Sequence, residues 1–182
     1  MKIRLTLLFC FFLETVFSQT LVQKLPEAGL QFILPDNQWS AKKREKVNGN
    51  MILYNYKREP ITDSLNRGII ANISVLIEDI ENPMKVSTYS IEKRKEVAFA
   101  VSKILTWKKG DLMLQQSIGY EGSYVDQNKN LHRIVVVHAV WGKKGVQFIC
   151  DATDSIWPMV KAEFLNAAKS LNKPFVSIRK KK

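Results

Sequence analysis

The chain has 182 residues, of which 46% are hydrophobic and 25% are charged, and its formal net charge is +11. This apolar content is enough for one hydrophobic core. Repeats, low-complexity segments and long Pro/Gly/Ser-rich linkers are missing from the sequence, which argues against disordered, fibrous and multidomain classes. The strong positive charge affects solubility and favours association with anionic partners, but it does not indicate a fold.

The first segment in chain order, residues 1–18, has the pattern of a secretory signal peptide. Lys2 and Arg4 make its beginning basic, a short apolar run follows, and Val16 and Ser18 are the small residues that a signal peptidase accepts before a cut. We therefore expect export to the periplasm or the extracellular space of a bacterium, with cleavage after Ser18.

Two other interpretations of this segment are disfavoured. A transmembrane anchor needs about 20 apolar residues, and this run is broken early by Glu14. A lipoprotein signal needs a small residue before Cys10, where the chain has Phe9. Cleavage would leave 164 residues with a net charge of +10 and a single cysteine, Cys150. No intramolecular disulfide can then form, and the lone thiol is expected to be buried.

Three β-strands are predicted in the first half of the mature chain, over residues 29–35, 50–59 and 67–80. Each is rich in Ile, Leu, Val or aromatic residues and is bounded by turn-forming residues. The polar segment 41–49 ends in a turn signal at Asn48-Gly49, and residues 60–66 are predicted to form a loop.

Two amphipathic helices are predicted. One begins after Pro83, and the other lies within residues 154–172. Apolar residues recur along the first at three- and four-residue steps, with a lysine at the edge of the stripe: Tyr89, Lys93, Val97, Ala100, Val101 and Ile104. The stripe of the second is entirely apolar: Trp157, Val160, Phe164, Ala167, Ala168 and Leu171. Asp154 or Ser155 would cap this helix, Pro158 is tolerated in its first turn, and Pro174 follows its end.

Further strands are predicted between the two helices, with a bend at Gly119 or Gly122, and the whole order predicts an α+β domain. Strands joined by short turns must be antiparallel, and two amphipathic helices need a sheet to cover. We therefore expect one domain over residues 19–175, an α/β/α sandwich whose central antiparallel sheet has one helix on each face. A basic tail, residues 176–182, follows it.

The segment 136–155 is predicted to form a β-hairpin that leads into the second helix. A turn over residues 142–145 would place Val137 opposite Cys150. Because side chains alternate between the two faces of a strand, Cys150 then lies among apolar residues on one face and His138 lies on the other. A nucleophilic cysteine needs its base within hydrogen-bonding distance, so we expect Cys150 to be a buried structural residue.

The candidate polar site is formed by His138, Asp151 and Gln147, which share the second face of this hairpin. In the predicted register His138 pairs with Ile149, which places Asp151 diagonally across from it. The two would form either an acid–base couple in a pocket or a satisfied polar pair beneath a helix, and the second is favoured because buried polar groups need partners. His132 lies on the same face about 20 Å from His138, so the two histidines cannot share a metal ion.

The sequence contains no recognisable cofactor or metal site. No Cys/His/carboxylate spacing suggests zinc, and the acidic segment 78–82 lacks a calcium-loop pattern. The glycines within residues 119–124 are not followed by a predicted helix, as those of a phosphate-binding loop would be. No serine has the context of a nucleophile elbow. We therefore predict no cofactor, no metal and no enzymatic activity.

Basic residues cluster at several places along the chain: Lys42, Lys43, Arg44 and Lys46; Lys108 and Lys109; Lys143 and Lys144; and Arg179 to Lys182. Such turns and tails are most often simply solvated. The alternative is an anion-facing patch, formed by the first cluster together with Lys143 and Lys144, that binds anionic lipid, polysaccharide or nucleic acid. No motif for sequence-specific nucleic-acid binding accompanies it. Trp107 and Trp141, each beside lysines, would extend such a patch.

Several of these segments resemble the PsbP-like domain family. Residues 29–32 (GLQF), followed by Pro35 and Trp39, are similar to the opening pattern of that family, and residues 72–77 (NISVLI) fit one of its strands. The hairpin and a closing helix that ends in AAKSL, residues 167–171, also fit. The resemblance covers most of residues 25–172. It implies an α/β/α sandwich and a role in binding, assembly or chaperoning rather than in catalysis.

We therefore expect an exported, non-enzymatic binding or assembly module at the cell envelope, with a protein partner of unknown identity and no transmembrane span after cleavage. Two alternatives stay open: an enzyme that uses His138 and Asp151 as an acid–base pair, and a basic-surface binder of an anionic ligand. A hydrogen bond between His138 and Asp151 at the floor of an open cleft would favour the enzyme. Binding that weakens steeply with salt would favour the anion binder.

Overall fold

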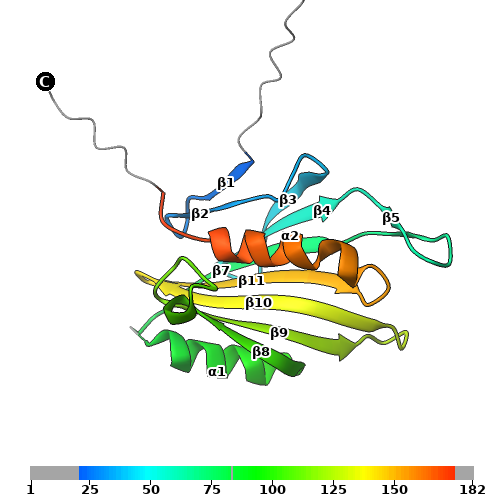
Figure 1. The fold of residues 1–182 in the computed structure, drawn as a ribbon. Coiled ribbons are helices and arrows are strands. Elements are labelled where there is room, and N and C mark those ends of the chain that lie inside the picture. The colour runs from blue at the N-terminus through cyan, green and yellow to red at the C-terminus, as the bar shows by residue number, and fades with distance from the viewer. Residues whose placement is uncertain (1–20, 83, 175–182) are drawn as a thin grey trace, which may run out of the picture.

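A seven-stranded antiparallel sheet forms the centre of the protein in the computed structural model, which describes residues 21–82 and 84–174 (Figure 1). The strand order is β3-β4-β7-β11-β10-β9-β8. The strands are β3 (Trp39–Val47), β4 (Met51–Arg58), β7 (Asn72–Asp79), β8 (Ala100–Thr106), β9 (Ser117–Val125), β10 (Leu131–Trp141) and β11 (Lys144–Thr153). The predicted α+β class and antiparallel sheet are confirmed, whereas the predicted signal peptide and basic tail lie outside the described residues.

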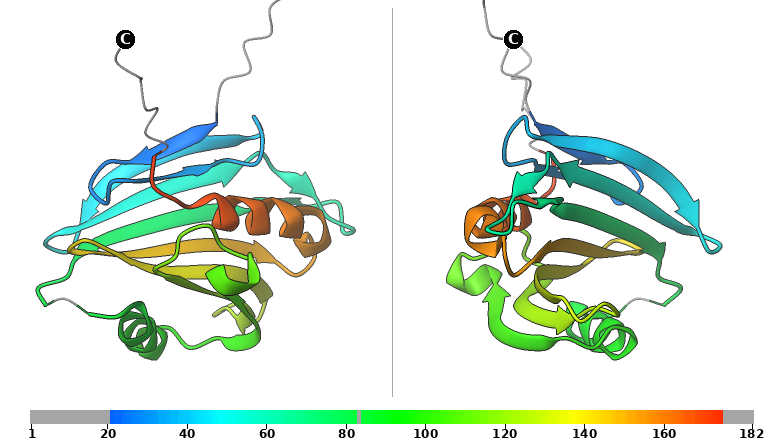
Figure 2. Two further views of the ribbon diagram at one scale, coloured as in Figure 1. Left: turned by 60° about the vertical axis from the view of Figure 1, so that its left-hand side comes forward. Right: turned by 90° about the vertical axis from the view of Figure 1, so that its right-hand side faces the viewer.

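One face of the sheet is covered by α2 (Trp157–Ser170) and by a hairpin of β1 (Val22–Leu25) and β2 (Leu30–Ile33) (Figure 2). Phe32 of β2 packs edge-on against Phe148 of β11, with ring centroids 5.0 Å apart. All but the first residue of the predicted apolar stripe of α2 are buried: Val160, Phe164, Ala167, Ala168 and Leu171. The main hydrophobic core therefore lies on this side of the sheet.

The start of α2 differs from the prediction. Its N-cap is Ile156, and no side chain caps the helix. Asp154 instead forms an ion pair with Arg133 of β10 at 2.6 Å, and the Ser155 hydroxyl lies 3.0 Å from that of Thr153. The predicted cap is therefore wrong, because the two candidate side chains contact Arg133 and Thr153 instead of the first N–H groups of the helix.

The opposite face of the sheet carries α1 (Val86–Glu96), which packs against β9 and β10. The predicted extension of this helix to Ile104 is wrong, because residues 100–106 form β8, an outer strand that pairs with β9. Sheet pairing overrides the local helical spacing, and Val97 and Ile104 of the expected buried stripe are 61% and 52% exposed. Among the described residues, no helix is both long enough and apolar enough to cross a bilayer.

The polar segment 41–49 lies largely within β3, a strand that its composition does not predict. β3 is the outer strand on its side of the sheet and pairs with β4. Charged side chains on outer strands prevent edge-to-edge aggregation, and they remove the apolar alternation by which a strand is recognised. The turn at Asn48-Gly49 is confirmed, with φ values of 36° and 72°.

A smaller hairpin interrupts the predicted loop 60–66 and extends beyond it. It pairs β5 (Ile61–Thr62) with β6 (Gly68–Ile69). Asp63 stabilises the turn between them, since its carboxylate accepts hydrogen bonds from the backbone N–H groups of Leu65 and Arg67 and pairs with the Arg67 guanidinium at 2.7 Å. The loop is therefore more ordered than its composition suggests.

The glycines of β9 permit close packing against the neighbouring strands. The strand continues unbroken through Gly119 and Gly122. A Cβ atom on Gly122 would lie 2.5 Å from the carbonyl oxygen of Ala100 in β8, and one on Gly119 would lie 3.3 Å from the side chain of Val137. A side chain would therefore clash with the β8 backbone at Gly122 and would be tightly packed at Gly119. The bend at these glycines stays a prediction.

Candidate functional site

The β10–β11 hairpin turns at Gly142 and Lys143, so that Trp141 pairs with Lys144. Gly142 has a φ of 60°, and glycine at the first position of a two-residue turn allows a tight hairpin. The predicted register is therefore wrong by two residues. A shift by an even number of residues leaves every side chain on its predicted face.

Cys150 lies on the face that α2 covers and is fully buried. Its Sγ atom is 3.9 Å from the carbonyl oxygen of Phe164 in α2. Burial, and secondarily the charge of Asp151, raise the pKa of the thiol well above its ordinary value, which keeps the sulfur protonated and unreactive. The expectation of a buried cysteine, separated from His138 by the sheet, is confirmed.

His138 lies on the other face of the sheet, beneath α1. Its Nδ1 atom is 2.9 Å from the Ser90 hydroxyl of α1, which is also 2.7 Å from the Tyr120 hydroxyl of β9. The residue is 2% exposed. Burial, together with the positive charges of Arg94 and Lys93, lowers the pKa of His138 to about 4. The imidazole is therefore neutral at neutral pH and joins a helix to two strands.

A cavity of about 260 Å³ opens beside His138, between α1 and the sheet. Most of its wall is apolar and comes from Val97, Phe99, Ile134, Val136 and Ile149. Its polar lining consists of Lys93, Tyr124, His138, Gln147 and Asp151. All three residues of the predicted polar site therefore line one cavity. An apolar wall with a few polar groups is the usual composition of a small-molecule site.

His138 and Asp151 lie too far apart in this cavity to form the predicted pair. His138 pairs with Gln147 across the hairpin, whereas Asp151 pairs with Ile134, four positions along β10. Four strand residues span about 13 Å. The predicted diagonal contact is wrong because the two-residue shift in register moves Asp151 away from His138.

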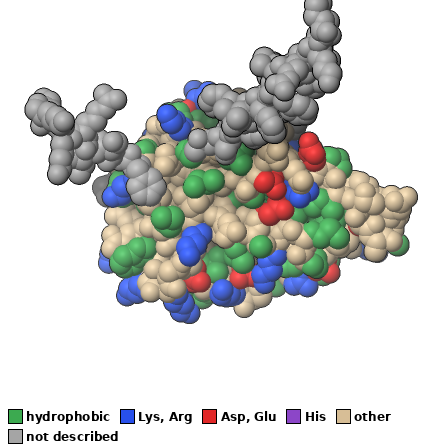
Figure 3. Space-filling model, turned by 45° about the horizontal axis from the view of Figure 1, so that its top comes forward, with side chains coloured by type: hydrophobic (Ala, Val, Ile, Leu, Met, Phe, Trp, Pro, Cys, Tyr) green, Lys and Arg blue, Asp and Glu red, His purple; other side chains and the backbone are tan. Residues whose placement is uncertain are grey.

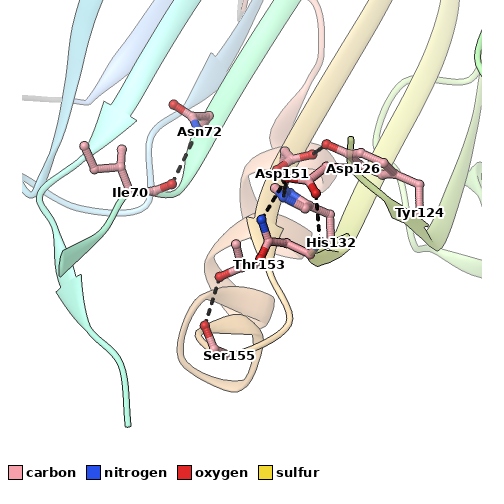
Figure 4. Close-up of polar contacts among 9 residues, drawn as sticks. Ile70, Asn72, Tyr124, Asp126, His132, Asp151, Thr153 and Ser155 are labelled. Carbon is pink, nitrogen blue, oxygen red and sulfur yellow. Dashed lines mark hydrogen bonds and ion pairs between the residues drawn. The ribbon is translucent and has the colours of Figure 1, made fainter. Parts of the chain in front are cut away.

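Asp151 belongs instead to a polar cluster around His132, at the end of the hairpin farthest from its turn (Figure 4). Its Oδ1 atom lies 2.7 Å from His132 Nδ1, and the Tyr124 hydroxyl donates to its Oδ2 atom at 2.6 Å. The Tyr124 ring stacks on His132 with centroids 5.0 Å apart, and Asp126 lies 3.5 Å from His132 Nε2. His132 pairs with Thr153, so it makes the diagonal contact to Asp151 that was predicted for His138.

Tyr124 holds this cluster together as a hydrogen-bond donor. Burial and then the hydrogen bond to Asp151 raise the pKa of its phenol above the ordinary value. The alternation of β10 places His132 on the correct face, but the sequence carries no signal that sets the register. Sequence reasoning therefore missed the cluster. It could place His132 and Asp151 on the same face of the hairpin, but it could not show that they lie next to each other.

Lys93 lies at the α1 side of the cavity, where its charge is balanced. Its Nζ atom lies 3.0 Å from Glu78 and 3.1 Å from Glu96. Burial disfavours the charged form, but these hydrogen bonds and charges outweigh it and raise the pKa of Lys93. Tyr89 also donates to Glu78 at 2.6 Å. The lysine is therefore engaged by the protein and is not a free cation facing the cavity.

The predicted anion-facing patch is divided in the structure. Lys43 pairs with Glu45 at 2.6 Å, Arg44 pairs with Glu27, and Lys144 pairs with Asp79 at 2.6 Å. Lys46 and Lys143 are exposed, whereas the side chain of Lys42 lies outside what the structure describes. Strands β4 and β7 separate β3 from β11, a spacing of about 14 Å. These residues therefore do not form one continuous basic surface.

Metal-ligating side chains do not gather in the part of the chain that the structure describes. No group of three or more His, Cys, Asp or Glu residues within residues 21–82 and 84–174 is arranged to hold an ion. The cluster around His132 is held by hydrogen bonds and ring stacking.

Comparison with known proteins gives similarity at the level of structure alone. No family model and no curated protein match the chain. The fold resembles a PsbP structure. It aligns with the solution structure of cyanobacterial PsbP (CyanoP) from Synechocystis sp. PCC 6803 with a TM-score of 0.47 and 12% sequence identity, over 85% of this chain and 93% of that chain. The resemblance to PsbP-like domains that the motifs predict is thus also found in the structure. A shared fold does not transfer the role of the cyanobacterial protein to this chain.

Proposed function

We propose that this chain is an exported, non-enzymatic binding module of the cell envelope that holds a small, mainly apolar ligand between α1 and the sheet. The observation that carries the proposal is the cavity of about 260 Å³. Its apolar wall comes from β10, β11 and the segment that follows α1, and a few polar groups interrupt it. Such a cavity gains affinity from apolar burial and specificity from the polar groups.

The polar groups of the cavity favour a neutral ligand with one hydrogen-bonding group. His138 is uncharged at neutral pH, and its Nε2 atom has no hydrogen-bond partner among the described residues. The charge of Lys93 is balanced by Glu78 and Glu96. An anionic ligand would compete with these carboxylates for the lysine. A neutral ligand would meet an apolar wall and the free edge of His138.

The geometry gives little support to the alternative of an acid–base enzyme. His138 Nδ1 is engaged by Ser90, and both carboxylate oxygens of Asp151 have partners. A catalytic pair must lie within hydrogen-bonding reach of one another or of a shared substrate proton, and about 13 Å of strand separates these two residues. Export is proposed from the sequence of residues 1–18, which lie outside the described residues.

Binding of indole to the purified mature protein tests the proposal. Indole has an apolar ring and one N–H group, and a ligand that binds only the folded state raises the Tm. We expect millimolar indole to raise the Tm of the wild type but not that of Ile149→Trp, whose larger side chain fills the cavity. Ile33→Trp is the matched control, because Ile33 is 49% exposed on β2, away from the cavity. No shift in the wild type, or an equal shift in Ile149→Trp, would overturn the proposal.

A further inference from the structure

Trp107 and Trp141 line a single open groove of about 590 Å³ at the end of the molecule where β10 turns into β11. The segment that follows β8 reaches this end because the Met113 N–H donates to the carbonyl of Lys169 at 3.2 Å and the Val140 N–H donates to that of Gln116 at 3.1 Å. The similar sequences WKKG and WGKKG, residues 107–110 and 141–145, are therefore brought together in space, at the left of Figure 1.

The rim of this groove exposes large apolar side chains. Trp107 is 43% exposed and Met113 is 44% exposed. Trp141 is half-buried deeper in the groove, and the ammonium group of Lys173 lies 4.2 Å from the centroid of its ring. Exposed apolar groups that gather at one place mark a surface that contacts something else.

Five exposed lysines lie on the segments that form or border the groove: Lys108, Lys109, Lys143, Lys169 and Lys173. Within the described part of the chain, none of the five forms an ion pair. The left-hand end of the molecule in Figure 3 accordingly shows several basic side chains and few acidic ones. Pro174 lines the groove, and the sequence after it supplies four more basic residues, which lie outside the described residues.

We propose that this end of the molecule docks on an anionic lipid bilayer. Trp107 and Met113 would lie at the level of the headgroups, where tryptophan is enriched in membrane proteins, and the five lysines would face lipid phosphates. The positive charge matches an anionic surface, and the apolar residues match the boundary between headgroups and acyl chains. The cavity beside His138 is formed by other residues, so the docking surface does not depend on the proposed ligand.

Co-sedimentation of the mature protein with vesicles tests this docking. We expect binding to vesicles of equal parts phosphatidylglycerol and phosphatidylcholine, and much weaker binding to phosphatidylcholine alone. The affinity should fall steeply with added salt, because exposed charges are screened. Inorganic phosphate at matched ionic strength should compete no better than chloride. Binding to neither vesicle, equal binding to both, or selective competition by phosphate would overturn the proposal.

Substitutions separate the contributions of charge and apolar contact. Each lysine near an anionic surface contributes about five-fold to affinity, so Lys108→Ala/Lys109→Ala should bind about thirty-fold more weakly. Lys57→Ala/Lys95→Ala removes the same charge elsewhere and should have little effect. Trp107→Ala should weaken binding even though the net charge is unchanged. Equal loss in the two lysine pairs, unaltered binding by Trp107→Ala, or preference for a single-stranded oligonucleotide over vesicles would each rule out this surface as a lipid site.

Discussion

Asp151 and His132 form a hydrogen-bonded pair across the β10–β11 hairpin, with Oδ1 of the aspartate 2.7 Å from Nδ1 of the histidine. The second carboxylate oxygen accepts a hydrogen bond from Tyr124 of β9. Both oxygens of Asp151 are therefore used to join three strands. This assigns Asp151 to the stability of the sheet, whereas Nε2 of His138 has no hydrogen-bond partner among the described residues.

The substitution Asp151→Asn should lower the free energy of unfolding by about 1–2 kcal/mol, because it weakens hydrogen bonds to a charged group. Urea denaturation of the mature protein measures this change. Asp154→Asn is the matched control, because the Asp154 side chain is 46% exposed in its pair with Arg133. An exposed pair contributes at most about 1 kcal/mol. Equal effects of the two substitutions would show that the His132 cluster has no special importance.

The stability of the fold should depend on pH through His138. Its pKa is lowered from 6.5 to about 4 in the folded chain, so the unfolded chain binds the proton more readily. The stability that the neutral imidazole contributes is fully present above pH 6.5 and is lost as the pH falls from 6.5 to about 4. The free energy of unfolding should fall by about 3 kcal/mol over this range. His138→Gln should show a flatter pH dependence over this range. Identical pH profiles of the two proteins would refute the prediction.

Gly145 allows α1 to approach the sheet. A Cβ atom there would lie 2.6 Å from two ring carbons of Tyr89, which is 2% exposed. Gly145→Ala should therefore destabilise the protein by about 1–3 kcal/mol, the usual cost of overpacking. The same change made in a Tyr89→Leu background should cost less, because the ring is gone.

Gly68→Ala provides the control for this cycle, since the nearest atom to its added Cβ would be 3.5 Å away. Thermal unfolding of the single and double variants gives the coupling between positions 145 and 89. Additive effects would mean that Gly145 and Tyr89 are not packed against each other.

Cys150 should not react with a thiol reagent in the folded mature protein. The side chain is fully buried, and burial raises its pKa. Labelling should therefore require unfolding, and its rate should increase with added urea. Ser155→Cys, at an exposed position, should be labelled at once at its new thiol under the same conditions. Rapid native labelling of Cys150 would mean that α2 does not seal this face.

Much of the architecture can be predicted from periodicity. The apolar stripe of α2 and the division of β10 and β11 into two faces depend on which side chains are apolar, and an even shift in register does not alter them. This is why the separation of Cys150 from His138 was predictable although the pairing was not.

The remaining features depend on interactions that the sequence pattern does not contain. The register is set by a turn at Gly142 and Lys143 rather than over four residues, and this decided which histidine meets Asp151. Residues 100–106 have helical spacing, but pairing with β9 makes them a strand. The cavity likewise depends on where α1 ends, because Val97 and Phe99, which follow Glu96, form part of its wall.

Nuclear Overhauser effects between indole and methyl groups of the mature protein test the central claim most directly. The proposed site predicts contacts from the indole ring to the methyl groups of Val136 and Ile149, which line the cavity, and to the ring of Phe99. Contacts confined to Met113 and Trp141, which line the groove beside Trp107, would contradict a ligand site between α1 and the sheet. Contacts confined to surface methyl groups elsewhere would contradict it as well.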